Sequence, residues 1–285
     1  RPGRDDKIIV AWNGLMIDSM ARAGAALHEP EYVVTASEAA SYILSRLRNN
    51  DGRLLHTSRA GVPKLDAYLD DYASLANALV SLYEATFNER WIDDAVSLMD
   101  VVLEKFIDPA GGGFFYTASD HEQLITRTKE LTDSSTPSGN ALAATALLRL
   151  GKLLGRSDYL EAASQTLASA VPLLERAPMA AGQMLLALDR HLGPSHELVI
   201  VGDMSRDDTK AALAAVHGRY LPRSVIAARD STSNDACGSR SSRLDELFLG
   251  KQSADGQPVL YVCQNFACQE PAVGLVAIES ALATI

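Results

Sequence analysis

The segment that decides the fold is LDAYLDDYASLANALVSLYEATFNERWIDDAV, residues 65–96. It opens with two adjacent acids, Asp70 and Asp71, followed by Tyr72. A long run of apolar residues at helical spacing comes next, and it is typical of a helix in the protein core. The two acids therefore either cap this helix or form part of a site at its start.

Similar helical patterns lie on both sides of this segment, and most of them come in pairs. Trp12, Tyr72 and Asn140 mark corresponding helix starts, roughly 60 to 70 residues apart. A repeat of this length predicts a solenoid or a closed ring of helix hairpins, of which about three and a half are present. The expected helices cover residues 13–27, 32–48, 71–87, 90–106, 138–154, 158–174 and 179–192.

From residue 194 the pattern changes to alternating strands and helices. The apolar runs ELVIVGD (197–203), SVIAA (224–228) and PVLYVCQ (258–264) predict strands, with amphipathic helical segments around them. The expected fold is mainly α, with part of an (α/α)6 toroid over residues 1–193 and a small α/β unit over residues 194–285.

Composition excludes several classes of function. The 285 residues are 47% hydrophobic and 22% charged, with a formal net charge of −10, which argues against nucleic acid or an anionic membrane as the main partner. No apolar run reaches the roughly 18–20 residues of a membrane span. The three cysteines do not make a disulfide framework, so a cytoplasmic location is expected.

Five motifs occur in order along the chain: DDKIIVAWNGLMI (5–17), LDDYASLANALVSLYEATF (69–87), GGGFFYT (111–117), PSGNALAATALLRL (137–150) and VLYVCQNFACQEP (259–271). Together they resemble the YyaL-like, spermatogenesis-associated thioredoxin-domain-containing family. The resemblance implies an N-terminal thioredoxin-like domain, followed by a six-hairpin toroid similar to that of N-acylglucosamine 2-epimerases. This chain matches the C-terminal part. We therefore expect the N-terminal half of the same protein, or a homodimer partner, to cover the open edge of the ring.

In a ring of hairpins the starts of the inner helices converge at one end of the central cavity. Aromatic, acidic and amide groups gathered there would suit a small-molecule sugar. Asp70 fits the cap position and Asp71 the site, although both acids can equally be read as a cap and a helix-dipole partner. The expected substrate-binding residues are Trp12, Asn13, Asp70, Tyr72, Tyr116 and Asn140.

The expected catalytic residues are Asp71, His56 and Glu130. An epimerase or isomerase needs a base beside a carbonyl, and His56 is a candidate. A glycoside hydrolase needs a second carboxyl group across the bond, for which Glu130 is the best candidate, although a solvated loop charge fits Glu130 as well. A sugar epimerase or isomerase is the first hypothesis. The alternatives are a non-catalytic sugar- or protein-binding module and a six-hairpin hydrolase. Nothing in the sequence implies a cofactor, a metal or nucleic acid.

Cys263 and Cys268 follow a predicted strand at a spacing that differs from the C-x-x-C of redox pairs. We expect two structural thiols. Thiol exchange with the thioredoxin-like domain that the resemblance implies is the second interpretation.

Overall fold

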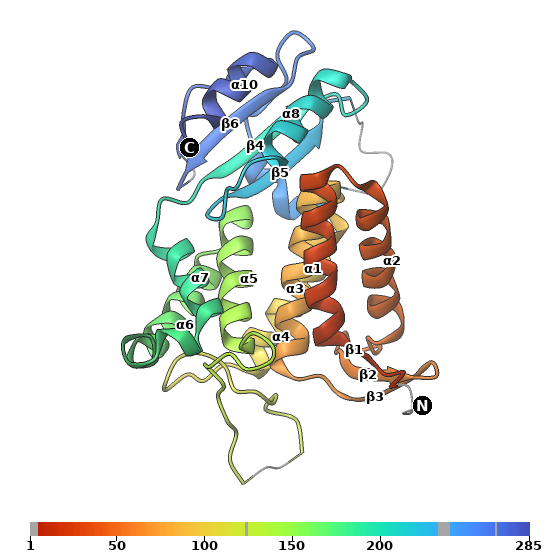
Figure 1. The fold of residues 1–285 in the computed structure, drawn as a ribbon, viewed down its shortest axis with the longest axis vertical. Helices are drawn as coiled ribbons and strands as arrows, with labels where there is room; N and C mark the ends of the chain where they lie inside the picture. Colours follow the sequence, from red (N-terminus) through yellow and green to blue (C-terminus); the bar gives the residue numbers. More distant parts are fainter. Residues whose placement is uncertain (1–4, 123–124, 233–239, 266) are drawn as a thin grey trace.

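The computed structural model describes residues 5–122, 125–232, 240–265 and 267–285. Its N-terminal part is a row of helix hairpins, and its C-terminal part is a sheet that lies across one end of that row (Figure 1). The helices of the row are α1 (Val10–Leu27), α2 (Pro30–Arg46), α3 (Leu69–Thr86), α4 (Arg90–Lys105), α5 (Gly139–Leu154), α6 (Ser157–Arg176) and α7 (Gly182–Leu192).

Helix α3 lies between α1 and α5 (Figure 1), and most of its residues are buried. Its many alanines and serines allow close packing on both sides. On one side Gly14 of α1 faces the α3 backbone, where a Cβ atom would lie 2.8 Å from Leu75 N. On the other side Gly139 of α5 faces Asp70, with the nearest backbone atom 3.2 Å from such a Cβ. The inner helices therefore pack at distances that larger residues would prevent.

The starts of α1, α3 and α5 lie at the same end of the row (Figure 1), as the repeat of Trp12, Tyr72 and Asn140 predicts. A small antiparallel sheet of β1 (Ile8–Ile9), β2 (Leu55–Arg59) and β3 (Val62–Asp66) lies at this end. In the loop between α4 and α5, an antiparallel bridge joins Ile107 and Phe114.

One carboxylate joins the starts of two inner helices. Asp133 Oδ1 accepts a hydrogen bond from Ser138 N, just before α5, and its Oδ2 accepts one from Gln183 N in the first turn of α7. Each helix start thus gains an acceptor for an N–H that has no partner inside the helix. Ser138 also accepts a hydrogen bond from Ala141 N and so caps α5.

The second sheet has the order β5-β4-β6-β7, with β8 also paired to β6. Strands β4 and β5 are parallel, and β6 runs antiparallel to β4. Its strands are β4 (Glu197–Gly202), β5 (Val225–Asp230), β6 (Val259–Gln264), β7 (Ala267–Cys268) and β8 (Ala272–Val273). The helices of this part are α8 (Asp207–His217), α9 (Asp245–Phe248) and α10 (Leu275–Leu282).

Alternate residues of β4 enter two different cores, because neighbouring side chains of a strand point to opposite faces. Val199 and Val201 pack with the helix row, whereas Leu198 and Ile200 pack under α8 and α10. The sheet is thus covered on both faces, by the row on one side and by α8 and α10 on the other (Figure 1). The change from helices to sheet falls between Leu192 and Glu197, and a domain boundary there stays a prediction.

The structure joins Cys263 and Cys268 in a disulfide, so the expectation of two free thiols is wrong. The two residues are five positions apart, yet they lie directly opposite each other across the pair β6–β7. The spacing alone does not reveal this, because it depends on where the chain turns. The cytoplasmic location stays a prediction.

Candidate functional site

The candidate site lies at the start of α3, where the small N-terminal sheet meets the first inner helices. Asp71 is at its centre and is fully buried. Its Oδ1 accepts a hydrogen bond from Ala11 N at 2.9 Å, and its Oδ2 accepts one from Tyr68 N at 2.9 Å. The same Oδ2 lies 2.8 Å from Nδ1 of His56. One carboxylate therefore joins α1, the start of α3 and strand β2.

This geometry reverses the predicted roles of the two acids. Asp71 occupies the third position of the helix and binds the backbone N–H of Tyr68, the residue just before α3. Asp70 is only partly buried, and its own contact is with the neighbouring N–H of Asp71 at 3.1 Å. The expectation that Asp70 caps the helix and Asp71 meets a substrate is wrong, since Asp71 is closed off from solvent.

In the contact between His56 and Asp71, only His56 reaches solvent. Its side chain is 21% exposed and that of Asp71 is 0% exposed. The hydrogen bond to Asp71 raises the pKa of His56 above its ordinary value, against the opposing effect of burial. Because Nδ1 faces Asp71, the ring orientation is fixed, and no described residue binds Nε2. Nε2 is the atom that can exchange a proton with a ligand.

Burial raises the pKa of Asp70 to about 6, and the charge of Asp71 acts in the same direction. His56 opposes this rise, so the imidazole and the Asp70 carboxyl group act on each other electrostatically. Two titratable groups with displaced pKa values beside each other are the pattern of an acid–base site.

Aromatic rings form one wall of the candidate site. Tyr68 and Tyr116 stack with centroids 4.8 Å apart, and His56 meets Tyr68 edge-on at 5.1 Å. Burial raises the pKa of Tyr116, with further contributions from Asp70 and Asp71. On the opposite edge, His121 approaches Tyr68 at 5.7 Å. The Nε2 atom of His121 is buried without a hydrogen-bond partner among the described residues.

Two predicted substrate-binding residues are part of the core instead. Tyr72 is fully buried, and its hydroxyl accepts a hydrogen bond from Leu54 N at 2.9 Å. Asn140 is also fully buried and binds both the N–H and the carbonyl of Phe114, at 2.7 and 2.9 Å. Both side chains hold loops against helices, so the expectation that they contact a sugar is wrong.

The other predicted residues lie around the same end of the row. Trp12 is 62% exposed in the first turn of α1, and Asn13 donates to Ile9 O at 2.8 Å. Glu130 is exposed, and its charge acts on Tyr116. Direct contact of these three residues with a substrate stays a prediction.

Sequence analysis missed Tyr68, although the signal was present. An acid at the third position of a helix binds back to the residue before the first turn, and Asp71 stands three residues after Tyr68. His121, a residue of the loop that follows Tyr116, also lies beside Tyr68. In the described part of the chain, no three His, Cys, Asp or Glu side chains form a group that could hold a metal ion.

The chain was compared with known sequences and solved structures. No family model matches the sequence. Spermatogenesis-associated protein 20 of Mus musculus is 31% identical over 277 residues, which are 94% of this chain and 35% of that protein. The chain is homologous to part of spermatogenesis-associated protein 20. The Homo sapiens protein gives 31% identity over 95% of this chain and 35% of its own length.

The chain spans about a third of the length of these two proteins. The resemblance drawn from the five sequence motifs is confirmed at this level. Among solved structures, the GH76 α-mannanase of Bacteroides thetaiotaomicron has a TM-score of 0.55 at 16% identity, over 77% of this chain and 62% of that chain. This likeness concerns the fold alone. It confirms a mainly α chain that forms part of a six-hairpin toroid, and a small α/β unit follows.

Among the residues that the structure describes, none of the helices combines the length and the apolarity needed to cross a membrane.

Replacing Asp70 by asparagine is expected to stabilise the protein at pH 7 by about 1–2 kcal/mol, after allowance for partial exposure. A carboxyl group whose folded pKa is raised to about 6 is destabilised when it ionises. Wild type therefore loses stability as the pH rises from about 4 to about 6, and the asparagine variant avoids this loss. Urea unfolding at pH 4 and pH 7.5 measures the difference.

The matched control is Asp66→Asn, because Asp66 is exposed. It should change stability little at either pH. A gain for Asp70→Asn that is equal at pH 4 and pH 7.5 would show that ionisation of Asp70 is not its cause.

Proposed function

We propose that this chain contributes the proton-transfer site of a sugar epimerase or isomerase, with His56 and Asp70 as the acid–base pair. The proposal rests above all on the 2.8 Å contact between His56 Nδ1 and the buried Asp71 Oδ2. A buried carboxylate that orients a partly exposed imidazole is a recurrent arrangement for proton transfer. Asp71 acts here as a positioning residue.

The directions of the pKa shifts suggest which group is the acid. Asp70, with a pKa of about 6, is mostly ionised at neutral pH, whereas His56 has a raised pKa. Asp70 would take the proton from the carbon next to the sugar carbonyl, and protonated His56 would donate from Nε2 to the carbonyl oxygen. The enediol then returns a hydroxyl proton to His56 as the carbonyl re-forms. A proton delivered to the opposite face of the same carbon gives the epimer, and one delivered to the neighbouring carbon, with loss of the proton on the other oxygen, gives the isomer. These roles differ from the sequence hypothesis, in which His56 was the base.

The surroundings support a sugar as the substrate class. The stacked rings of Tyr68 and Tyr116 offer apolar surface beside the two titratable groups. Trp12 and Asn13 in the first turn of α1 are proposed as further contacts, with the exposed indole as a stacking platform.

The test follows solvent exchange. The protein is incubated in D2O with mannose, glucose or cellobiose, and NMR follows deuterium at C2. One sugar is expected to gain deuterium, with a rate that is highest between pH 6 and the raised pKa of His56. His56→Asn and Asp70→Asn should each lower the rate by a factor of about 100 or more. His28→Asn is the matched control, since His28 is exposed at the end of α1.

Exchange that continues in folded His56→Asn would refute the role of His56. If no sugar exchanges but one of them raises the melting temperature of the protein, the result favours the non-catalytic binding module.

Glycoside hydrolysis is the second candidate. A carboxyl group with a pKa of about 6 also suits a general acid that protonates a leaving sugar, and Asp70 has this property. Glu130 is then the second carboxylate, because its charge also reaches Tyr116. Release of new reducing ends from an oligosaccharide, without deuterium at C2, would favour this reaction over epimerisation.

We further propose that the open edges of the helix row are covered in the working protein. Exposed apolar side chains lie at both ends of the row: Trp12 and Met16 on α1 are 62% and 60% exposed, and Leu186 on α7 is 61% exposed. The proposed partner is the N-terminal half of a longer protein, with a thioredoxin-like domain and further hairpins, or a second copy of the chain. Light scattering distinguishes the second copy from a monomer.

A further inference from the structure

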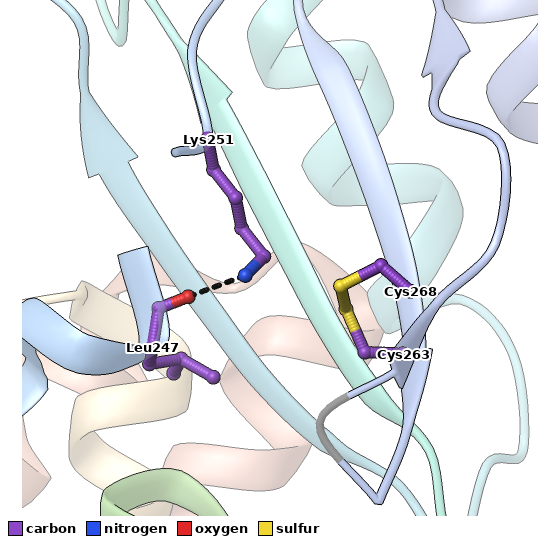
Figure 2. The surroundings of a disulfide bond; sticks show 4 residues. All are labelled: Leu247, Lys251, Cys263 and Cys268. Carbon is purple, nitrogen blue, oxygen red and sulfur yellow. Dashed lines mark hydrogen bonds between the residues drawn. A yellow bond between two sulfur atoms is a disulfide. The ribbon is translucent and has the colours of Figure 1, made fainter. Parts of the chain in front are cut away.

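The two cysteines of the Cys263–Cys268 disulfide differ in their exposure to solvent. Cys263 is 2% exposed in β6, which pairs with β4 over five residue pairs. Cys268 is exposed in the two-residue strand β7 at the edge of the sheet. Figure 2 shows the bond between these neighbouring strands. Cys268 is therefore the solvent-facing end of the bond, and we expect a reagent to attack there rather than at Cys263.

The fold does not depend on this bond to hold β6 in place. Strand β6 is fixed by β4 along one side and also pairs with β8 on the other. The disulfide closes a loop of only five positions, and closing so short a loop removes little entropy from the unfolded chain. Strand β7 is itself paired to β6 through the backbone, so we expect the core to survive opening of the bond.

The surroundings are open to a protein partner. Gln264, Asn265, Ala267, Gln269 and Glu270 are all exposed. Lys251 points to the carbonyl of Leu247, which it meets at 2.7 Å, rather than to the disulfide (Figure 2). Because both cysteines are oxidised in the bond, the attacking thiolate has to come from the partner.

We propose that Cys263 and Cys268 form a thiol–disulfide exchange site for a partner that carries two thiols. The partner's thiolate attacks Sγ of Cys268, and the bond between the two protein sulfurs breaks. The electron pair goes to Sγ of Cys263, which takes up a proton. The second thiol of the partner then attacks the partner's sulfur in the mixed disulfide, and Cys268 leaves as a thiolate that is protonated. The protein disulfide is reduced by two electrons and the dithiol is oxidised to a disulfide.

The edge of the sheet beside the disulfide also contacts the helix row. Asn265, in the turn between the two strands, accepts a hydrogen bond from Lys152 Nζ of α5 at 2.7 Å. This hydrogen bond links the end of β6 to an inner helix of the row.

The test uses Cys237→Ser, which leaves these two cysteines as the only ones in the chain. The folded protein is equilibrated with mixtures of reduced and oxidised dithiothreitol, a dithiol probe, and thiols are counted by maleimide mass tagging. Two thiols are expected to appear and disappear reversibly without denaturant, with an unchanged circular dichroism spectrum. A bond that opens only in denaturant, or a spectrum that collapses on reduction, would show a structural staple and overturn the proposal.

A matched pair of variants tests the direction of attack in the same background. Cys263→Ser leaves the exposed Cys268 thiol, and Cys268→Ser leaves the buried Cys263 thiol. The Cys268 thiol should react with an aromatic disulfide reagent about 100-fold faster, since a buried thiol must wait for local opening. Equal rates, or a faster Cys263, would contradict attack at Cys268.

Discussion

Replacement of Asp71 by alanine should lower the free energy of unfolding by about 3–5 kcal/mol, because buried donors lose their acceptor. Ala11 N and Tyr68 N would both be left without the carboxylate that now accepts from them. The loss should also release His56 and abolish sugar exchange. Urea unfolding of wild type and variant, followed by circular dichroism, measures the first effect.

Part of this stabilisation depends on pH. The pKa of His56 is raised in the folded protein, chiefly by its hydrogen bond to Asp71. The contribution of the charged pair is therefore complete below the ordinary histidine pKa, about 6.5, and is lost as the pH rises through the folded pKa. The stability difference between wild type and Asp71→Ala should shrink over that range. A loss below about 1 kcal/mol at every pH would show that Asp71 does not hold the helix starts.

Replacement of Arg149 by alanine should destabilise the protein by about 3–5 kcal/mol, because it breaks a buried ion pair. Arg149 is 1% exposed, and its guanidinium donates to Asn77 O at 3.0 Å and to Glu84 Oε2 at 2.7 Å. Without it the Glu84 carboxylate, 15% exposed, loses its main partner. Thermal and urea unfolding at neutral pH measure the change.

The control is Arg206→Ala, which removes an exposed ion pair with Asp208 and should change stability by less than about 1 kcal/mol. The double variant Arg149→Met with Glu84→Gln should recover part of the stability, since it leaves no unpaired charge. If Arg149→Ala is as mild as Arg206→Ala, the buried pair contributes little to the fold.

The repeat of helix pairs could be predicted from sequence because helical periodicity is a local property. Helical periodicity was less informative about which face of each helix meets solvent. Tyr72 and Asn140 stand at inner-helix starts, as predicted, but α3 and α5 are enclosed by neighbours at those positions. The orientation of a side chain within a row of packed helices depends on crossing geometry, which the pattern does not contain.

The contrast between Asp70 and Asp71 has the same origin. Consecutive helix residues point about 100° apart, so the two acids were expected to have different roles, one as the cap and one in the site. Which one does so depends on the position of Ala11, 60 residues earlier in the chain. The disulfide was missed for a related reason, because its geometry arises from a turn between two strands.

The underside of β4 and the helix row share one core, in which Val199 and Val201 pack with residues of the inner helices. This has a consequence for folding order. Neither part can reach its final packing alone, because each supplies apolar surface that the other needs to exclude water. The helices are made first during synthesis, so the nascent row must wait with that end uncovered until the last third of the chain has emerged.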